Sequence, residues 1–172
     1  MQEQLKRADL AFAGASPDRH PQLERLLHLW EGLRHGSALP AANSFSALLH
    51  KPWLANLATV AVMNRRFRVM SMGAACVEIA GGSNVGRFVD ECVASADREA
   101  ALQPYRACAG EAVPLFSNAQ YMRAGFACLT VHRLYLPCAD DGREVDTLLI
   151  GVYPVDSRGV FGAPAAKPMS LT

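Results

Sequence analysis

The chain has 172 residues, of which 51% are apolar, and its 17 basic and 16 acidic side chains leave a formal net charge of +1. This length and composition fit one domain with a real hydrophobic core. The balanced charge argues against a general nucleic-acid binder, which needs a basic face to neutralise phosphates. No apolar run reaches the roughly 20 residues that cross a bilayer, and no apolar signal core follows Met1. We therefore expect a cytoplasmic protein without a membrane span.

The cysteines stand singly along the chain. They are Cys76, Cys92, Cys108, Cys128 and Cys138. Their number is odd and none forms a CxxC pair, so the pattern favours neither a disulfide framework nor a zinc site. We expect reduced, half-buried thiols in a reducing compartment.

An amphipathic helix is predicted over residues 21–35, after a flexible lead over 1–18. Pro21 suits the first turn of a helix, and Gly36 and Pro40 end the pattern. Apolar side chains follow at helical spacing and form one face. That face consists of Leu23, Leu26, Leu27, Trp30 and Leu33. We expect it to be an interface, either with the rest of the chain or with a second subunit.

The remaining pattern predicts two strands, then several short helices, then three strands. Asn64-Arg65-Arg66 reads as the turn of a hairpin, and Pro104 predicts a kink or a fresh start in a helix. Strands are expected over 57–63, 67–72, 113–121, 126–136 and 145–153, and short helical segments within 45–54, over 73–80, around 88–94 and over 97–109. These elements predict one domain over 19–156, built on a five-stranded antiparallel sheet. A loose tail is expected over 157–172.

Both faces of this sheet are predicted to be apolar. On the fourth strand Leu134 and Leu136 share one side, whereas Val131 and Tyr135 share the other. The fifth strand repeats the pattern over 145–153. Because both faces need a cover, the middle helices are expected on one face and the helix over 21–35, or a partner subunit, on the other.

Several short motifs occur in an order that is similar to a known family. They are His28-Leu29-Trp30-Glu31-Gly32-Leu33-Arg34, Leu39-Pro40, Phe67-Arg68-Val69 leading into Gly73, Gly82, Gly86-Arg87 and Val145-Asp146-Thr147-Leu148-Leu149-Ile150-Gly151. In this order they resemble the single-domain PAS family common in alphaproteobacteria, over about residues 20–156. The resemblance implies an α+β, PAS-like fold, with short helices on one sheet face and the N-terminal helix on the outer face.

The same resemblance implies a non-catalytic sensory or regulatory domain. Such domains usually form homodimers, act by contact with a signalling partner, and can bind a small ligand between the sheet and the helices. About 18 residues follow the last predicted strand, too few for an output domain. We therefore expect signalling through protein–protein contact.

Candidate pocket residues come from the strands and one loop. They are Met70, Met72, Phe88, Val131, His132 and Ile150. Strand alternation places Met70 and Met72 on one face, and methionine adapts to irregular apolar ligands. The alternative for these residues is plain core packing.

No cofactor is required by the sequence, although haem and flavin each have one candidate position. His132, in mid-strand, is a haem ligand in one interpretation and a core or sheet-surface histidine in the other. The segment from Asn84 to Phe88 faintly resembles the flavin loop of light-sensing relatives, but Val85 stands where photochemistry needs a thiol. A metal is expected only if haem is bound to His132. A haem- or flavin-binding sensor is therefore the first alternative function.

No catalytic constellation is visible in the sequence. It has no nucleophile beside a base, no P-loop and no Gly-x-Ser-x-Gly elbow. Asp140 and Asp141 fit a glycine turn, and Asp97 and Glu99 fit the start of a helix. We expect no enzyme, and an unrecognised small enzyme stands as the second alternative.

Overall fold

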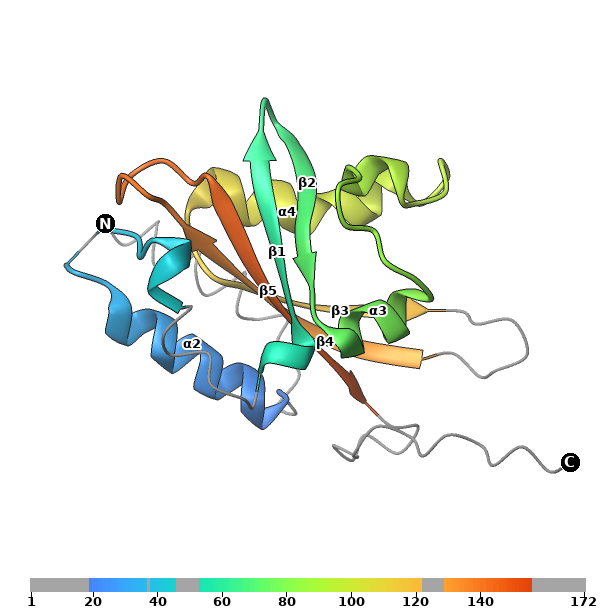
Figure 1. Cartoon of the computed structure of the whole chain (residues 1–172), viewed down its shortest axis with the longest axis horizontal. Helices are drawn as coiled ribbons and strands as arrows, with labels where there is room; N and C mark the ends of the chain where they lie inside the picture. Colours follow the sequence, from blue (N-terminus) through green and yellow to red (C-terminus); the bar gives the residue numbers. More distant parts are fainter. Residues whose placement is uncertain (1–18, 37, 46–52, 122–128, 156–172) are drawn as a thin grey trace, which may run out of the picture.

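The computed structural model describes residues 19–36, 38–45, 53–121 and 129–155 (Figure 1). Its elements, in chain order, are α2 (Pro21–Leu33), η1 (Ala42–Phe45), η2 (Leu54–Asn56), β1 (Leu57–Met63), β2 (Arg66–Met72), α3 (Ala74–Ala80), η3 (Val89–Glu91), α4 (Arg98–Glu111), β3 (Leu115–Tyr121), β4 (Leu129–Cys138) and β5 (Thr147–Val155). The expected lead over 1–18 and the tail over 157–172 lie outside the described residues.

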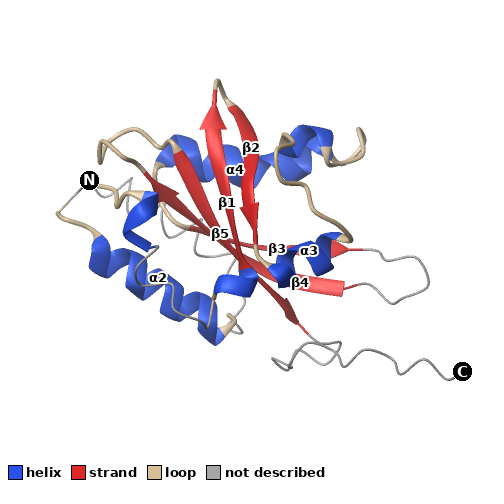
Figure 2. Cartoon of the chain, viewed as in Figure 1, coloured by secondary structure: helices blue, strands red, loops and turns tan. Residues whose placement is uncertain are grey.

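The strands form one five-stranded sheet in the order β2-β1-β5-β4-β3, and every neighbouring pair is antiparallel. Along the chain, helical segments precede two strands, and further helical segments precede the last three strands, as expected. Helices lie on both sides of the sheet (Figure 2). The predicted α+β architecture with a five-stranded antiparallel sheet is therefore confirmed. β1 pairs with both β2 and β5, so the N-terminal hairpin joins the C-terminal strands through its first strand.

The local turn chemistry explains most element boundaries. Asn64 and Arg65 have φ values of 49° and 63°, which is the geometry of a tight two-residue hairpin, so β2 begins already at Arg66. α4 continues through Pro104 instead of starting afresh there, and it ends in the left-handed Ala112. The helix predicted around 88–94 is only the short η3.

Two apolar clusters fill the two faces of the sheet. The outer cluster contains Leu23, Leu26, Leu27, Trp30, Leu134, Leu136, Leu149 and Tyr153, among others. The inner cluster contains Val60, Phe67, Cys76, Ile79, Leu102, Cys108, Val131, Tyr135, Leu148 and Ile150, among others. Strand alternation therefore sorts the side chains as the sequence predicted. α2 covers the outer face, whereas α3, η3 and α4 contribute to the inner cluster.

α2 is held on the outer face by packing and by two indole hydrogen bonds. Trp30 is 1% exposed, and its Nε1 donates to the carbonyl of Pro137 on β4 over 2.8 Å. Trp53 Nε1 donates to the carbonyl of Gln22 over 2.9 Å. A Cβ at Gly151 would lie 2.6 Å from Leu23 Cδ2, so the helix approaches closely because this position has no side chain.

The predicted interface residues of the helix thus pack against the chain's own sheet. Leu23, Leu26, Leu27 and Trp30 are buried there, and Leu33 is partly buried against the same cluster. Of the two covers expected for the outer face, the N-terminal helix is the one observed.

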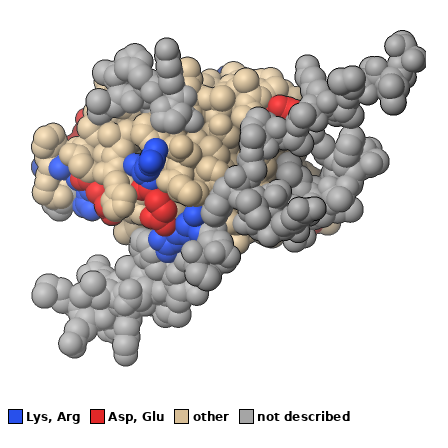
Figure 3. Space-filling model, turned by 90° about the horizontal axis from the view of Figure 1, so that it is seen from below, with Lys and Arg blue, Asp and Glu red and all other residues tan. Residues whose placement is uncertain are grey.

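The surface carries charges of both signs. In the face shown in Figure 3, Lys and Arg side chains lie beside acidic ones rather than in a patch of one sign. Within the described part of the chain, no helix has the length and apolar character of a membrane span.

Candidate functional site

The layer between the sheet and α4 contains a polar group inside an apolar wall. Arg133 stands on β4 opposite Val152, between Val131 and Tyr135 on the inner face. Its Nη1 donates to the hydroxyl of Tyr135 over 3.1 Å. The Tyr135 ring meets the Tyr105 ring of α4 edge-on, with centroids 5.1 Å apart. We call Arg133, Tyr135 and Tyr105 the inner polar cluster.

The electrostatics of the inner polar cluster favour one cation among neutral donors. Burial opposes the charge of Arg133, but Tyr135 and Tyr105 support it, and the pKa of Arg133 lies above its usual value. Burial raises the pKa of the Tyr105 hydroxyl, with a further contribution from Tyr135. Burial also raises the pKa of the neighbouring Cys76 thiol to about 11. At neutral pH the Tyr105 phenol and the Cys76 thiol therefore stay protonated beside a guanidinium.

Three of the six pocket candidates lie at this inner layer. Val131 and Ile150 are buried in the inner cluster. Met72 is partly buried against it, and its Sδ accepts a hydrogen bond from Asn84 N over 3.3 Å.

Met70 corrects the inference that the two methionines share a face. The register slips at β2, where Thr59 pairs with Ser71 and Val60 with Val69, so Met70 has no partner on β1. Met70 continues the exposed side of β2, where Arg66 and Arg68 also lie, and its side chain is 52% exposed. The bulge shifts the alternation for the residues that follow. Met72 faces the inner cluster instead.

Phe88 lies at the edge of the sheet, beside β2. Its backbone forms an isolated bridge with Arg68, and the guanidinium of Arg66 lies 3.7 Å from the centre of its ring. Arg66 in turn pairs with Asp90 and Glu91, both at 2.9 Å. These contacts place Phe88 in a surface cluster, away from the inner polar cluster.

His132 lies on the opposite face of the sheet from the predicted pocket. It pairs with Tyr153 of the outer cluster, and the ring of His20 stacks on Tyr153 with centroids 4.1 Å apart. Burial and the nearby His132 lower the pKa of His20 to about 4. Because Val131 faces the inner layer, its neighbour His132 must face α2. A haem bound in the inner layer would therefore not meet this histidine.

The inner polar cluster was not predicted from the sequence, although one signal was present. On β4, Val131 and Tyr135 were placed on one apolar face, and Arg133 occupies the position between them. A charged residue in the middle of an apolar face was the anomaly that pointed to it. Tyr105 carried no comparable signal, because its place depends on how α4 crosses the sheet.

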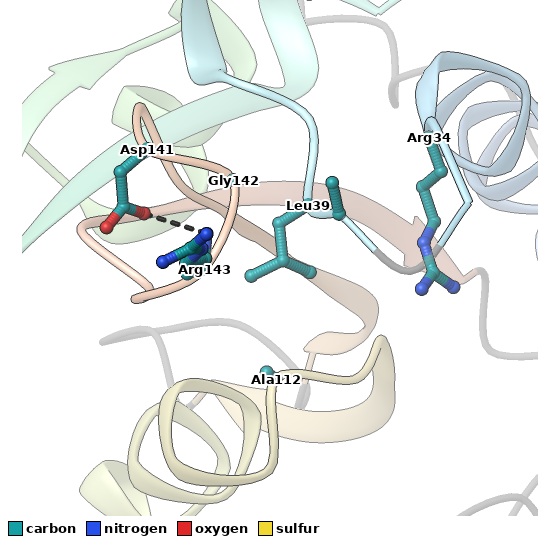
Figure 4. A pocket seen from close by; sticks show the side chains of 7 residues that line it. Arg34, Leu39, Ala112, Asp141, Gly142 and Arg143 are labelled. Carbon is teal, nitrogen blue, oxygen red and sulfur yellow. Dashed lines mark hydrogen bonds between the residues drawn. The ribbon is translucent and has the colours of Figure 1, made fainter.

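A hollow lies at the end of α2, where the chain forms a pocket of about 320 Å³ (Figure 4). Its lining residues are Arg34, Ala38, Leu39, Ala112, Asp141, Gly142 and Arg143. Across the described ranges, no group of three or more His, Cys, Asp or Glu residues is arranged to hold a metal ion.

Comparison with known proteins gives a likeness of fold. No protein-family model and no curated protein matches the sequence. Among solved structures, the PAS domain of BvgS from Bordetella pertussis superposes with a TM-score of 0.50 and 16% identity, covering 67% of this chain and 87% of that one. This similarity confirms a PAS-like fold.

Two further structures are similar at lower scores. A domain of an HTR-like protein from Haloarcula marismortui has a TM-score of 0.40 and 14% identity, covering 58% of this chain and 96% of that one. An RNA-binding light-oxygen-voltage receptor has a TM-score of 0.42 and 13% identity, covering 64% of this chain and 32% of that one.

Proposed function

We propose that this chain is a PAS-type sensory or regulatory domain of the single-domain kind. It acts by contact with a signalling protein, as a homodimer, and a small ligand held between the sheet and α4 tunes that contact. The observation that carries this proposal is the inner polar cluster, which lies in the layer where the resemblance predicts a ligand.

The partial burial of Arg133 against the apolar inner cluster supports a role beyond packing. Moving a guanidinium out of water is expensive, and an apolar side chain of similar volume is often as stable in such a position or more so. A ligand pocket, in contrast, combines apolar walls with a few convergent polar groups. Arg133, Tyr135 and Tyr105 supply hydrogen-bond donors between the apolar walls formed by residues such as Val131 and Ile150.

β4 offers a direct mechanical route from this layer to the outer face. Arg133 faces the inner cluster, and the next residue, Leu134, packs in the outer cluster against α2. The carbonyl of Pro137, four residues after Arg133 on the same strand, accepts the hydrogen bond from Trp30. A ligand that moves β4 therefore changes how α2 is seated, and α2 is the element that presents this change to a partner.

The test is to identify small molecules that purify with the full chain, by extraction and mass spectrometry, in the wild type and in Arg133→Met. We expect a molecule enriched in the wild type and reduced at least tenfold in Arg133→Met. The matched control is Arg68→Met, the same change on an exposed strand position whose Nε donates to Gly86 O. If the same small molecules are recovered in equal amounts from the wild type and from Arg133→Met, the proposed ligand site at the inner polar cluster is wrong.

The contact part of the proposal has a separate test. Light scattering of the purified chain is expected to show a dimer, and pull-down from the native cell is expected to recover a signalling protein. A monomer that recovers no such partner would contradict a function by contact.

A further inference from the structure

We propose that the pocket at the end of α2 is a second binding site, which takes a small dicarboxylate. The pocket lies where four segments meet (Figure 4). Arg34 follows α2, Ala38 and Leu39 follow in the next loop, Ala112 ends α4, and the turn between β4 and β5 supplies residues 141–143. This site is separate from the inner polar cluster and does not depend on the function proposed above.

The size and the lining fit a small molecule. A volume of about 320 Å³ lies at the lower end of ligand pockets, which span roughly 300–1,000 Å³. Leu39 is 8% exposed and, with Ala38 and Ala112, provides an apolar surface between the charged groups. In Figure 4, Arg34 and Arg143 lie on opposite sides of Leu39.

The two arginines define the chemistry of the ligand. A guanidinium pairs with a carboxylate through two parallel hydrogen bonds, which makes arginine the preferred partner of planar anions. Two guanidinium groups separated by an apolar residue match a molecule with a carboxylate at each end and a short hydrocarbon middle. Arg34 is also oriented from within the fold, since its Cζ lies 5.0 Å from the centre of the Trp30 ring.

Asp141, the acidic residue in the lining, is engaged by its own turn. Its Oδ1 accepts hydrogen bonds from Arg143 N over 2.7 Å and from Glu144 N over 2.9 Å. These bonds hold the pKa of Asp141 below its usual value, so the group is a carboxylate at neutral pH. The lining therefore carries two positive charges and one negative charge, and the negative one shapes the loop that presents Arg143.

The walls of the pocket are tied together by the backbone. Leu39 N donates to Gly142 O over 2.9 Å, and Gly142 N donates to Ala139 O over 3.1 Å. Gly142 has a φ of 75°, and a Cβ there would lie 3.4 Å from the Cβ of Ala38. The turn and the loop after α2 thus form a preorganised pair, which lowers the ordering cost of binding. A bound dicarboxylate joins the end of α2 to the turn between β4 and β5.

Calorimetric titration of the full chain with malonate, succinate, glutarate and adipate tests the site, with the monoamide succinamate as the singly charged control. We expect one chain length to bind best and succinamate to bind at least tenfold more weakly than succinate. Arg34→Gln and Arg143→Gln are each expected to weaken the best dicarboxylate about 10–100-fold, because each removes a charge-assisted contact. Arg65→Gln, in the exposed hairpin turn, is the matched control and is expected to bind like the wild type.

A further variant tests the charge of the lining. Asp141→Asn keeps an acceptor for the turn while removing the negative charge, so it is expected to tighten dicarboxylate binding several-fold. The proposal is overturned if no dicarboxylate binds in preference to succinamate, or if Arg143→Gln binds like the wild type.

Discussion

The two faces of the sheet are closed by different means. On the outer face, α2 contributes four buried apolar residues, an indole hydrogen bond to β4 and a close approach at Gly151. On the inner face, α3, η3 and α4 cover an apolar cluster beside which lie the partly buried guanidinium of Arg133 and the phenols of Tyr105 and Tyr135. The outer face is built for tight packing, whereas the inner face contains polar groups that packing alone does not require. We therefore expect stability to be concentrated under α2, whereas the ligand site that we propose lies under α4.

The largest expected effect is on the outer face, at Trp30. We expect Trp30→Ala to lower the free energy of unfolding by about 3–5 kcal/mol, as large aromatic-to-alanine changes in cores do. The change opens a cavity under α2 and leaves the Pro137 carbonyl without its indole donor. Urea unfolding followed by circular dichroism measures the loss.

A substitution of Arg133 on the inner face is expected to affect stability much less than Trp30→Ala. Arg133→Met is expected to change the free energy of unfolding by less than about 1 kcal/mol, because an apolar residue of similar volume keeps the packing and avoids the desolvation of a partly buried ion. If Arg133→Met costs as much as Trp30→Ala, Arg133 is a structural residue, and the two faces do not differ in the way described.

A smaller effect is expected at Gly151. In Gly151→Ala the added methyl group would lie 2.6 Å from Leu23 Cδ2 and 3.0 Å from Leu26 Cδ2, so α2 or these side chains must shift. Overpacking of this kind costs about 1–3 kcal/mol. The same unfolding measurement tests it.

The control for Gly151 is a glycine within α2 itself. A Cβ at Gly32 meets nothing within 4 Å, and Gly32→Ala is expected to stabilise the chain by up to about 1 kcal/mol through helix propensity. Equal effects of the two substitutions would show that α2 is not seated against Gly151.

The smallest expected effect is a pH dependence at the start of α2. Nδ1 of His20 accepts a hydrogen bond from Gln22 N over 3.2 Å, so the cap requires the neutral ring. Burial and His132 lower the pKa of folded His20 to about 4, from an ordinary value of 6.5. The unfolded chain therefore binds more protons in this range, and the contribution of His20 to stability falls as the pH drops from about 6.5 to about 4.

His20→Asn tests this dependence, because asparagine caps a helix without titrating. We expect the urea midpoint to fall less between pH 7 and pH 4.5 in His20→Asn than in the wild type. Other charged groups at this end, Arg19 and Glu24, are unchanged in the variant. His35→Gln, at an exposed position, is the control and is expected to follow the wild type. If the urea midpoint of His20→Asn falls with pH as steeply as that of the wild type, His20 is not the source of this pH dependence.

Much of the fold was predictable from periodicity. β1 has the bounds that its apolar run predicts, and α2 begins at Pro21 as its sequence indicates. The predicted helix extended to residue 35, but Arg34 adopts an extended ψ of 139° and closes the helix at Leu33. The bulge at Met70 was not predictable, because it depends on the register that β1 imposes on β2.

The candidate sites were less accessible to sequence reasoning than the fold. Val131 and Ile150 were placed at the inner layer because alternation is a local property of a strand. Arg133 was visible as a charge on an apolar face, but its neighbour Tyr105 lies 28 positions earlier in the chain. The pocket between Arg34 and Arg143 joins the two ends of the domain, and no local pattern brings those residues together.

The sequence by itself determined which residues form strands, where the amphipathic helix begins, and that both sheet faces are apolar, because these properties follow from side-chain spacing along a few turns or strands. Only the tertiary structure decided that α2 covers the outer face, that His132 faces α2 and Arg133 faces α4, and that Trp30 meets Pro137 across 107 positions. Such contacts depend on the order and twist of the sheet, which bring distant segments together through the sum of many weak interactions.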